Sequence, residues 1–235
     1  MTECLEDLNF KNLKIYQPKN GYRFTSDSVY LANFIKTKKN DVALELCSGC
    51  GVISVLLSKK QKQKKIYAIE LQENLANLFK KSIKFNNLED SIEIICDNAK
   101  NYNKYFQNNS FDVVFANPPY YKIGTGKQTS SVEINTAKYE NELDLNTFFQ
   151  ISSKLLKPKG HFYFCHDAKR LFEIFITLKK FNLAPKEMFF THGNEKLKAS
   201  TVFIHAQKDA NCTLDIFQSV LTNNQTFPDF LNNKE

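Results

Sequence analysis

Residues 111–121, FDVVFANPPYY, combine a buried strand with a stiff polar loop. The apolar residues up to Ala116 predict a strand, and two consecutive prolines end it because proline has no N–H for a ladder hydrogen bond. Pro118 also holds Asn117 away from helical torsions. Asn117 offers a carbonyl acceptor and an amide donor, and Tyr120 offers a flat ring. The loop therefore suits a planar nitrogen that carries two hydrogens, such as the exocyclic amine of adenine, although a simple Asn-Pro turn would leave the same pattern.

A glycine-bearing turn lies upstream of this loop. Residues 41–58 predict a buried strand, a turn and the start of a helix, which is the nucleotide-binding arrangement of a doubly wound sheet. Gly49 and Gly51 allow the backbone to come close to a ligand. Cys47 stands where this pattern usually has its first glycine. Glu45 precedes the turn, where a carboxylate can reach the charged amino-acid part of a cofactor.

Glu70 strengthens the interpretation of this turn. It ends a second predicted strand, residues 66–69, and follows Gly49 by 21 residues. At that spacing the acidic residue of this fold binds a ribose diol. We therefore assign Glu70, with Leu71 after it, to the cofactor site.

The third predicted strand, residues 92–96, is closed by Asp97 and Asn98. In this position Asp97 can accept a hydrogen bond from an adenine amine, while the backbone N–H of Asn98 meets a ring nitrogen. Capping of a following helix by Asp97 is an equally open interpretation. Both residues are candidate cofactor ligands.

The first 40 residues predict a hairpin and a helix. Its strands would be Leu13–Gln17 and Tyr22–Thr25, joined by a Pro-Lys-Asn-Gly turn. Ser26 or Asp27 would then cap the helix. Arg23 and Thr25 lie just ahead of the glycine turn, so this segment could fold over a bound ligand, although a plain hairpin and cap fits equally well.

Composition limits the classes of protein to consider. The 235 residues are 42% hydrophobic, which suffices for one core, and no apolar run approaches the roughly 20 residues of a membrane helix. The N-terminus lacks the basic and apolar regions of a secretory signal. We expect a cytoplasmic protein without membrane attachment. The net charge of +7 is consistent with a polyanionic partner, although a biased genome composition would also produce it.

The six cysteines do not predict a metal or redox centre. Cys47 and Cys50 form a C-x-x-C pair, but no second pair follows and the four histidines show no ligand spacing. We expect reduced, small, buried cysteine side chains and no metal.

The second half of the chain continues the alternation of helices and strands. Residues 121–143 form a long basic segment without periodicity, which beside an active site is usually functional or disordered. After it we expect, in order, a helix at Asp144–Leu156, a strand at His161–His166, a helix at Asp167–Phe181 and strands at Lys186–His192 and Ser200–Gln207.

Five strand–helix units followed by two strands resemble the class I S-adenosylmethionine-dependent methyltransferases. The motifs of that family correspond to residues 45–51, Glu70, Asp97 and the Asn-Pro-Pro-Tyr loop. The resemblance implies an α/β, Rossmann-like fold with a seven-stranded, mostly parallel sheet, helices on both faces and an antiparallel last strand. Residues 1–40 would complete the catalytic unit, 41–207 form the methyltransferase domain, and 208–235 pack on the sheet edge.

The segment NPPYYKIGTGKQ, a later AKYE and an early GYRFTSDS are similar to those of the bacterial tRNA(Val) adenine-37 N6-methyltransferase family. In that family the later segment is typically A-R-H-E, so Lys138 and Tyr139 depart from it. The resemblance implies S-adenosylmethionine as cofactor and tRNA as substrate. Asn117, Pro118 and Tyr120 would be catalytic, and the implied substrate contacts are Tyr120, Tyr121, Lys122, Lys127 and Lys138.

Two other classes remain open. Glutamine, rRNA and DNA adenine methyltransferases also carry an Asn-Pro-Pro-Tyr loop, but a release-factor enzyme usually has a helical N-terminal domain and a DNA enzyme a target-recognition domain, for which we find no candidate segment. A non-catalytic module that binds cofactor or RNA would also retain parts of the pattern. Cys47 in place of glycine favours such a module slightly, and the intact loop at Asn117 argues against it. Whether the Lys59–Lys65 run contacts RNA stays undecided.

Overall fold

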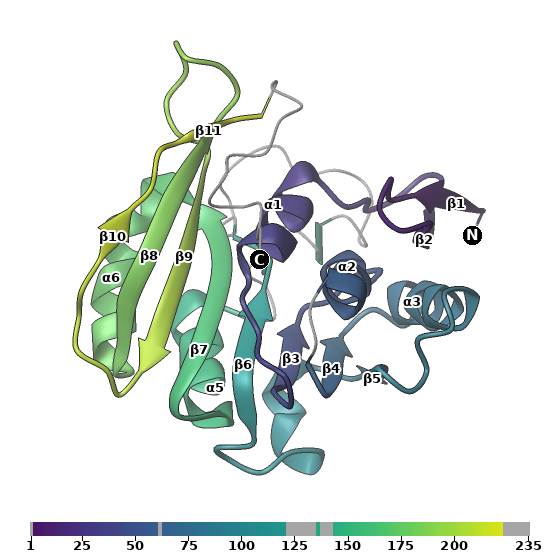
Figure 1. Cartoon of the computed structure of the whole chain (residues 1–235), viewed down its shortest axis with the longest axis horizontal. Coiled ribbons are helices and arrows are strands. Elements are labelled where there is room, and N and C mark those ends of the chain that lie inside the picture. Colours follow the sequence, from purple (N-terminus) through teal and green to yellow (C-terminus); the bar gives the residue numbers. More distant parts are fainter. Residues whose placement is uncertain (1, 61–62, 121–134, 137–142, 223–235) are drawn as a thin grey trace.

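The computed structural model describes residues 2–60, 63–120, 135–136 and 143–222. Within them lies a nine-stranded sheet, and its long strands are ordered β8-β9-β7-β6-β3-β4-β5 (Figure 1). Strands β3 to β7 pair in parallel, and β9 runs antiparallel to β7 and β8. The two-residue strands β10 and β11 pair with β8 beyond this core. The predicted α/β class, the mostly parallel sheet and its antiparallel last strand are confirmed.

The strands are β1 Glu3–Asp7, β2 Lys14–Pro18, β3 Val42–Leu46, β4 Lys65–Glu70, β5 Ile92–Cys96, β6 Phe111–Ala116, β7 Leu156–Asp167, β8 Leu183–His192, β9 Thr201–Lys208, β10 Asp215–Ile216 and β11 Val220–Leu221. The helices are α1 Ser26–Phe34, α2 Val52–Lys60, α3 Glu73–Phe85, α5 Leu145–Leu155 and α6 Leu171–Lys180, with the short 3₁₀ helices η1 Ala99–Lys104 and η2 Ala168–Arg170.

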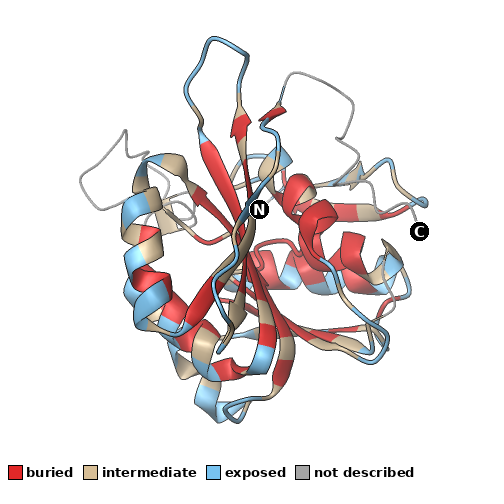
Figure 2. Cartoon of the chain, turned by 60° about the vertical axis from the view of Figure 1, so that its left-hand side comes forward, coloured by how far each residue is buried: buried red, intermediate tan, exposed pale blue. Residues whose placement is uncertain are grey.

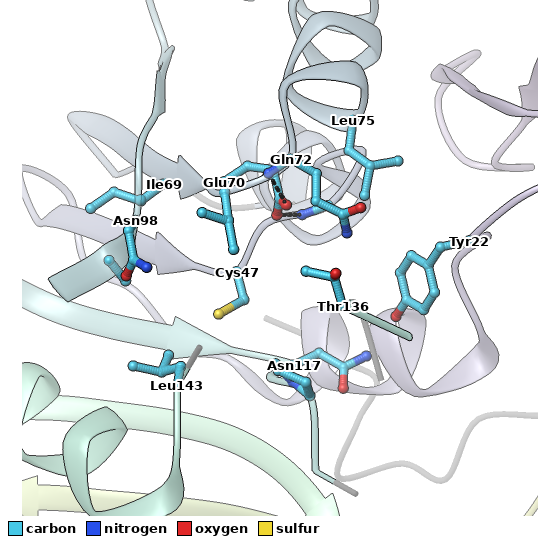
Figure 3. Close-up of a pocket in the computed structure, with 14 residues that line it drawn as sticks. Tyr22, Cys47, Ile69, Glu70, Gln72, Leu75, Asn98, Asn117, Thr136 and Leu143 are labelled. Carbon is cyan, nitrogen blue, oxygen red and sulfur yellow. Dashed lines mark hydrogen bonds between the residues drawn. The ribbon is translucent and has the colours of Figure 1, made fainter. Parts of the chain in front are cut away.

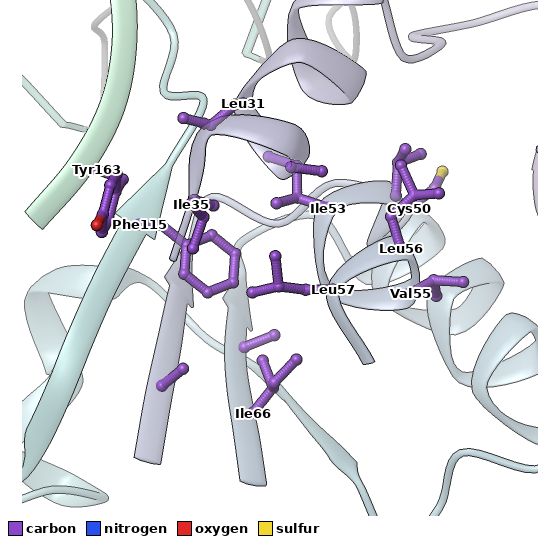
Figure 4. Close-up of a cluster of buried hydrophobic side chains, with 14 of the residues drawn as sticks. Leu31, Ile35, Cys50, Ile53, Val55, Leu56, Leu57, Ile66, Phe115 and Tyr163 are labelled. Carbon is purple, nitrogen blue, oxygen red and sulfur yellow. The ribbon is translucent and has the colours of Figure 1, made fainter. Parts of the chain in front are cut away.

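Helices cover both faces of the sheet because its central strands are apolar on both sides. On β6, Val113 and Phe115 face one cluster, shared with α1, α2 and α3 (Figure 4). Val114 and Ala116 face a second cluster, shared with α5 and α6. Buried residues therefore run along the central strands and the inner faces of the helices (Figure 2). A strand buried on both faces reads as a continuous apolar run, as expected for a parallel sheet.

The N-terminal hairpin differs from the prediction. Strand β2 pairs with the upstream strand β1, from Glu3 opposite Pro18 to Asp7 opposite Lys14, and residues 22–25 are not a strand. Tyr22 and Phe24 instead pack their rings against the apolar cluster on the α1 side of the sheet. Burial of two aromatic rings competes successfully with a second ladder on β2.

Two further boundaries were predicted only in part. Helix α5 begins after Asp144, whose side chain accepts from the Thr147 backbone N–H at 3.0 Å, so this cap acts as the pattern indicates. Strand β7, by contrast, starts at Leu156 rather than His161. The pairing of β6 with β7 has a register shift between Phe111 and Val113, near the start of both strands. This irregularity lets β7 continue through the predicted Lys-Pro-Lys-Gly turn.

The described part of the C-terminal tail follows β8. Strand β10 lies beside Glu187 and Met188, and β11 lies beside Thr191 and His192. None of the helices in the described ranges is both long and apolar enough to span a bilayer.

Candidate active site

The carboxyl ends of β3, β4, β5 and β6 meet at one edge of the sheet, and a cleft opens there (Figure 3). The cleft encloses about 600 Å³, including its open mouth. Its wall comes from the segments that follow these four strands, from the N-terminal segment and from residues near α5. The lining residues are Tyr22, Cys47, Gly49, Ile69, Glu70, Leu71, Gln72, Leu75, Asn98, Ala99, Asn117, Pro119, Thr136 and Leu143.

The turn after β3 uses left-handed backbone torsions at three positions. Cys47 has φ +57°, Gly49 +55° and Gly51 +80°. Glycine adopts these torsions without steric cost, whereas in cysteine they bring the Cβ close to the backbone and cause steric strain. A Cβ on Gly51 would lie 2.1 Å from the Phe79 ring, so this glycine permits the close packing of the turn on α3. A Cβ on Gly49 would face the cleft, 3.8 Å from the ring of Tyr22. The two glycines therefore serve packing and ligand approach respectively.

Glu70 closes this turn from the neighbouring strand. Its Oε2 accepts from the Gly49 N–H at 2.7 Å, and its Oε1 accepts from the Gln72 N–H at 2.9 Å. Burial raises the pKa of this carboxyl, and the backbone hydrogen bonds oppose the rise. The Leu71 backbone N–H also bonds this carboxylate, so its two oxygens keep about one lone pair beyond the three backbone hydrogen bonds. The carboxylate can therefore hold the turn and still accept from one hydroxyl of a vicinal diol in the cleft, which is compatible with the predicted ribose site.

Glu45 lies in a second hollow of about 370 Å³ that shares Cys47, Gly49 and Asn117 with the cleft. Its carboxylate accepts from the backbone N–H of Ser54 at 3.2 Å and also bonds the Ser54 hydroxyl. Burial raises the pKa of Glu45 to about 8. The predicted contact of this carboxylate with a charged cofactor group stays a prediction, and the hollow is where such a group would lie.

Asp97 and Asn98 are placed differently from each other. Asp97 accepts from its neighbour's N–H at 2.7 Å, from the Asn101 side chain at 2.7 Å and from the Tyr105 hydroxyl at 2.8 Å. These bonds hold its pKa well below the usual range. Asn98 lines the cleft and caps η1, because its side chain accepts from Lys100 N–H at 3.0 Å. Asp97 is not among the residues that line the cleft, and its carboxylate bonds the turn after β5. Its predicted contact with an adenine amine stays a prediction.

Asn117 lies where the cleft and the hollow meet. Its Nδ2 donates to Ser28 Oγ at 3.2 Å, and its Oδ1 accepts from the Cys165 thiol at 3.0 Å. Pro119 lines the cleft and Pro118 is buried. The Asn117 amide therefore faces the cleft, and hydrogen bonds with Ser28 and Cys165 fix its position.

Tyr120 follows at the end of the same loop. Its hydroxyl donates to Asp27 Oδ2 at 3.4 Å, its ring lies 5.5 Å from that of His166, and its carbonyl accepts from Arg170 at 3.1 Å. Contacts from three elements thus fix both the ring and the backbone of this residue.

Several cleft residues were not predicted, and Tyr22 is the main one. It lines the cleft and the hollow, facing Asn117 and Thr136 (Figure 3), and burial raises the pKa of its hydroxyl. The predicted neighbours Arg23 and Thr25 are exposed and are not among the lining residues; Arg23 pairs instead with Glu6. In the sequence, Tyr22 is only an aromatic residue after a turn, and this pattern is equally typical of a strand. Its place in the cleft was therefore not predicted.

The substrate contacts predicted at Tyr121, Lys122, Lys127 and Lys138 lie outside the described residues. Of the described cysteines, Cys50 and Cys165 are buried as expected, whereas Cys96 and Cys212 are exposed. Among the described side chains no group of three or more His, Cys, Asp or Glu is arranged to hold a metal ion.

The known proteins to which this chain is similar are named as methyltransferases, with different target atoms. The family model described as "Methyltransferase small domain" matches residues 23–177. A tRNA1(Val) (adenine(37)-N6)-methyltransferase from Shewanella halifaxensis is 28% identical over 151 residues, which are 64% of this chain and 60% of that protein. A tRNA (guanine-N(7)-)-methyltransferase from Lactobacillus gasseri is 29% identical over 132 residues, covering 56% and 55% of the two chains.

The fold is also shared with solved structures. A predicted O-methyltransferase from Agrobacterium tumefaciens superposes with a TM-score of 0.67 at 16% identity, over 88% of this chain and 95% of that one. The matches to the named tRNA enzymes span less than two thirds of their lengths.

Proposed function

The chain belongs to the methyltransferase small domain family, and on that basis we propose that it is an S-adenosylmethionine-dependent methyltransferase of adenine N6 in tRNA. The proposed target is adenine 37, next to the anticodon of tRNA(Val). Such a substrate would place the protein in the cytoplasm. The finding that carries the proposal is that Gly49, Glu70 and Asn117 line one cleft, because a cofactor turn and an amine-binding loop must share a cavity for transfer.

The residues of the cleft fit the proposed cofactor. We assign Glu70 as the acceptor for a ribose hydroxyl, and Asn98 and Ala99 as candidates for contacts with the adenine ring, because all three residues line the cleft. Glu45, in the hollow beyond the turn, is our candidate for the ammonium group. When bound, S-adenosylmethionine supplies an electrophilic methyl group on a sulfonium centre.

The Asn-Pro-Pro-Tyr loop supplies the substrate side of the proposal. The N6 lone pair of adenine is delocalised into the ring, so the amine is a poor nucleophile. We assign the Asn117 side-chain carbonyl and the Pro118 backbone carbonyl as acceptors of the two N6 hydrogens, which would turn the lone pair toward the methyl group. Most of the rate gain would then come from positioning and electrostatics. No strong base is needed beforehand, because the methylated nitrogen becomes acidic and releases its proton afterwards.

Tyr120 completes the assignment as the ring on which the target base stacks. Such stacking contributes about 1–3 kcal/mol per base in single-strand binding proteins. The base must leave its stack to enter the cleft, which costs less in an anticodon loop than in a duplex. The Lys122, Lys127 and Lys138 side chains remain our candidates for contacts with the RNA backbone.

Methylation of guanine N7 is the alternative raised by the Lactobacillus relative. N7 is a ring nitrogen with an in-plane lone pair and no hydrogens, so it needs no pair of acceptors. The Asn117 amide and the proline-braced loop have no obvious use in that reaction. These residues favour an exocyclic amine.

The direct test is methyl transfer to defined RNA. Purified protein is incubated with labelled S-adenosylmethionine and a tRNA(Val) transcript, and the digested nucleosides are separated by mass spectrometry. We expect N6-methyladenosine from the wild-type transcript and none from a transcript with guanine at position 37. Formation of 7-methylguanosine, or of N6-methyladenosine at equal rates in both transcripts, would contradict the assigned chemistry or the assigned position.

A further inference from the structure

The first turn of α1 contacts the Asn-Pro-Pro-Tyr loop through two consecutive residues. Ser28 Oγ lies 3.2 Å from Asn117 Nδ2, and Asp27 Oδ2 lies 3.4 Å from the Tyr120 hydroxyl. The contacts join segments about 90 residues apart in the chain. A short piece of one helix therefore touches two of the loop residues that the proposed function assigns to the substrate, Asn117 and Tyr120.

Asp27 does not serve mainly as a helix cap. The N-cap residue of α1 is Thr25, whose side chain makes no capping hydrogen bond, and Asp27 lies within the first turn. Its Oδ2 accepts from Tyr120 and, at 3.3 Å, from the Thr201 hydroxyl of β9. A carboxylate at a helix start usually stabilises that helix. This one is also committed to a tyrosine of another loop, and burial raises its pKa.

Ser28 and Cys165 together fix which way the Asn117 amide points. A serine hydroxyl can accept or donate, so Ser28 alone would tolerate either orientation. The Cys165 thiol is buried, and its S–H donates to the amide oxygen Asn117 Oδ1 at 3.0 Å. Burial raises the pKa of this thiol, so it keeps the hydrogen that it donates. The carbonyl oxygen must therefore lie on the Cys165 side, and Ser28 must accept from Nδ2. One lone pair of the carbonyl oxygen is left for a ligand.

We propose that Ser28 and Asp27 are positioning residues, which orient the Asn117 amide and the Tyr120 ring for the incoming amine. The proposal rests on the proposed function in assigning the substrate side of the cleft to this loop. Neither residue needs to touch the substrate. Their effect on the reaction would pass through the groups that they hold, where a displacement of about 1 Å can cost on the order of 100-fold in rate.

The kinetic test compares Ser28→Ala with Ser26→Ala, an exposed serine of the same helix turn. We expect Ser28→Ala to lower kcat by about 10- to 100-fold with KM for S-adenosylmethionine changed less than twofold, and Ser28→Thr to restore part of kcat. Ser26→Ala should change neither constant. Wild-type activity with an unaltered kcat in Ser28→Ala would overturn the proposal for this serine.

A double-mutant cycle tests Asp27 against the hydroxyl that it holds. Asp27→Ala and Tyr120→Phe should each lower kcat, and the double variant should lose no more than the worse single variant. Asp27→Asn, which keeps an acceptor oxygen, should recover most of the loss. Additive losses would mean that Asp27 acts independently of Tyr120, and the positioning role would be wrong.

A measurement without turnover separates this proposal from the proposed function. In protein labelled with ¹⁵N-asparagine, the side-chain amide signal of Asn117 is identified by its loss in Asn117→Ala. Ser28→Ala should shift that signal and speed its exchange with water, and Ser26→Ala should leave it unchanged. If the wild type fails to methylate tRNA, the proposed function is wrong, while a shifted signal still shows that Ser28 holds the Asn117 amide. An unchanged signal in Ser28→Ala shows that Ser28 does not hold this amide, whether or not tRNA is methylated.

Discussion

Two regions of the sheet gather polar side chains, and they use them differently. At the carboxyl edge, Glu70 and Asn117 are bonded to the protein but still face an open cleft. On strands β7, β8 and β9, His205 bonds His161 at 2.9 Å and Glu187 at 3.0 Å, and Lys36 bonds Glu187 at 2.9 Å. We call these four residues the histidine cluster. Its polar atoms satisfy one another, and they are not among the residues that line the cleft.

The comparison shows that perturbed titration alone does not identify a site. In the histidine cluster, burial first of all lowers the pKa of His161 to about 4, and the bond from His205 lowers that of Glu187 to about 2. These pKa shifts are of the same order as the rise at Glu45, although somewhat smaller. Ion-pair networks and active sites both produce such shifts. Access to a cleft distinguishes them, so substitutions at the open edge should change chemistry and those in the histidine cluster should change stability.

The largest effect is expected at Asn117. Asn117→Ala removes the proposed acceptor for the N6 hydrogens, so kcat should fall on the order of 10²- to 10³-fold, by comparison with the loss of a single transition-state contact in other enzymes. The dissociation constant for S-adenosylmethionine, measured by calorimetry, should change much less. Asn77→Ala, at an exposed position of α3, serves as the control. Equal losses of turnover and cofactor affinity would indicate a structural role for Asn117.

The two glycines of the turn sharpen the comparison within the open edge. Gly51→Ala would place a methyl group 2.1 Å from Phe79 at a left-handed torsion, so we expect a loss of roughly 3 kcal/mol or more in unfolding free energy. Gly49→Ala makes only an ordinary van der Waals contact with Tyr22, at 3.8 Å, and should cost about 1–2 kcal/mol for its left-handed torsion. That methyl group enters the cleft, however, and should weaken cofactor binding. Thermal unfolding and calorimetry on both variants check this division, which equal melting temperatures would contradict.

The parts of the site that were predictable from the sequence depend on local geometry. Gly49 and Glu70 follow from the strand–turn–helix pattern, and Asn117 follows from the two prolines that must end a strand. The turn and the end of the strand are each set by residues that are close together in the sequence. The mostly parallel sheet and its antiparallel last strand likewise followed from a resemblance carried by these motifs.

The parts that were not predictable depend on contacts between distant segments. Tyr22 lines the cleft and also packs against the apolar cluster on the α1 side of the sheet, and β2 pairs with the upstream strand β1. Asp97 could face a ligand or its own turn, and its bonds with Asn101 and Tyr105, which belong to the following segment, were not predicted. The local sequence pattern does not show which of these contacts is more stable, because tertiary packing decides their energies.

A pH-dependent effect is expected at Glu45, whose carboxyl is buried behind the turn. Its folded pKa of about 8 lies above the ordinary value of 4.5, so the folded state keeps a proton that the unfolded state releases. The contribution of this group to the free energy of unfolding is fully present below pH 4.5, and it is lost as the pH rises toward 8. Glu45→Gln cannot titrate, so its unfolding free energy should fall less over that range, by roughly a few kcal/mol. Urea unfolding from pH 5 to 8 measures the difference, with exposed Glu89→Gln as the control.

The smallest effect is expected in the histidine cluster, at Glu187. Its pKa is lowered to about 2, so its stabilising effect is present above the ordinary value of 4.5 and is lost as the pH falls toward 2. Glu187→Gln should therefore lower the unfolding free energy at pH 7 by about 1 kcal/mol, since the side chain is partly exposed. The gap between variant and wild type should close as unfolding is measured at lower pH. The variant should keep the wild-type kcat, because this cluster does not face the cleft, and a loss of turnover at unchanged stability would show that the closed cluster also serves the reaction.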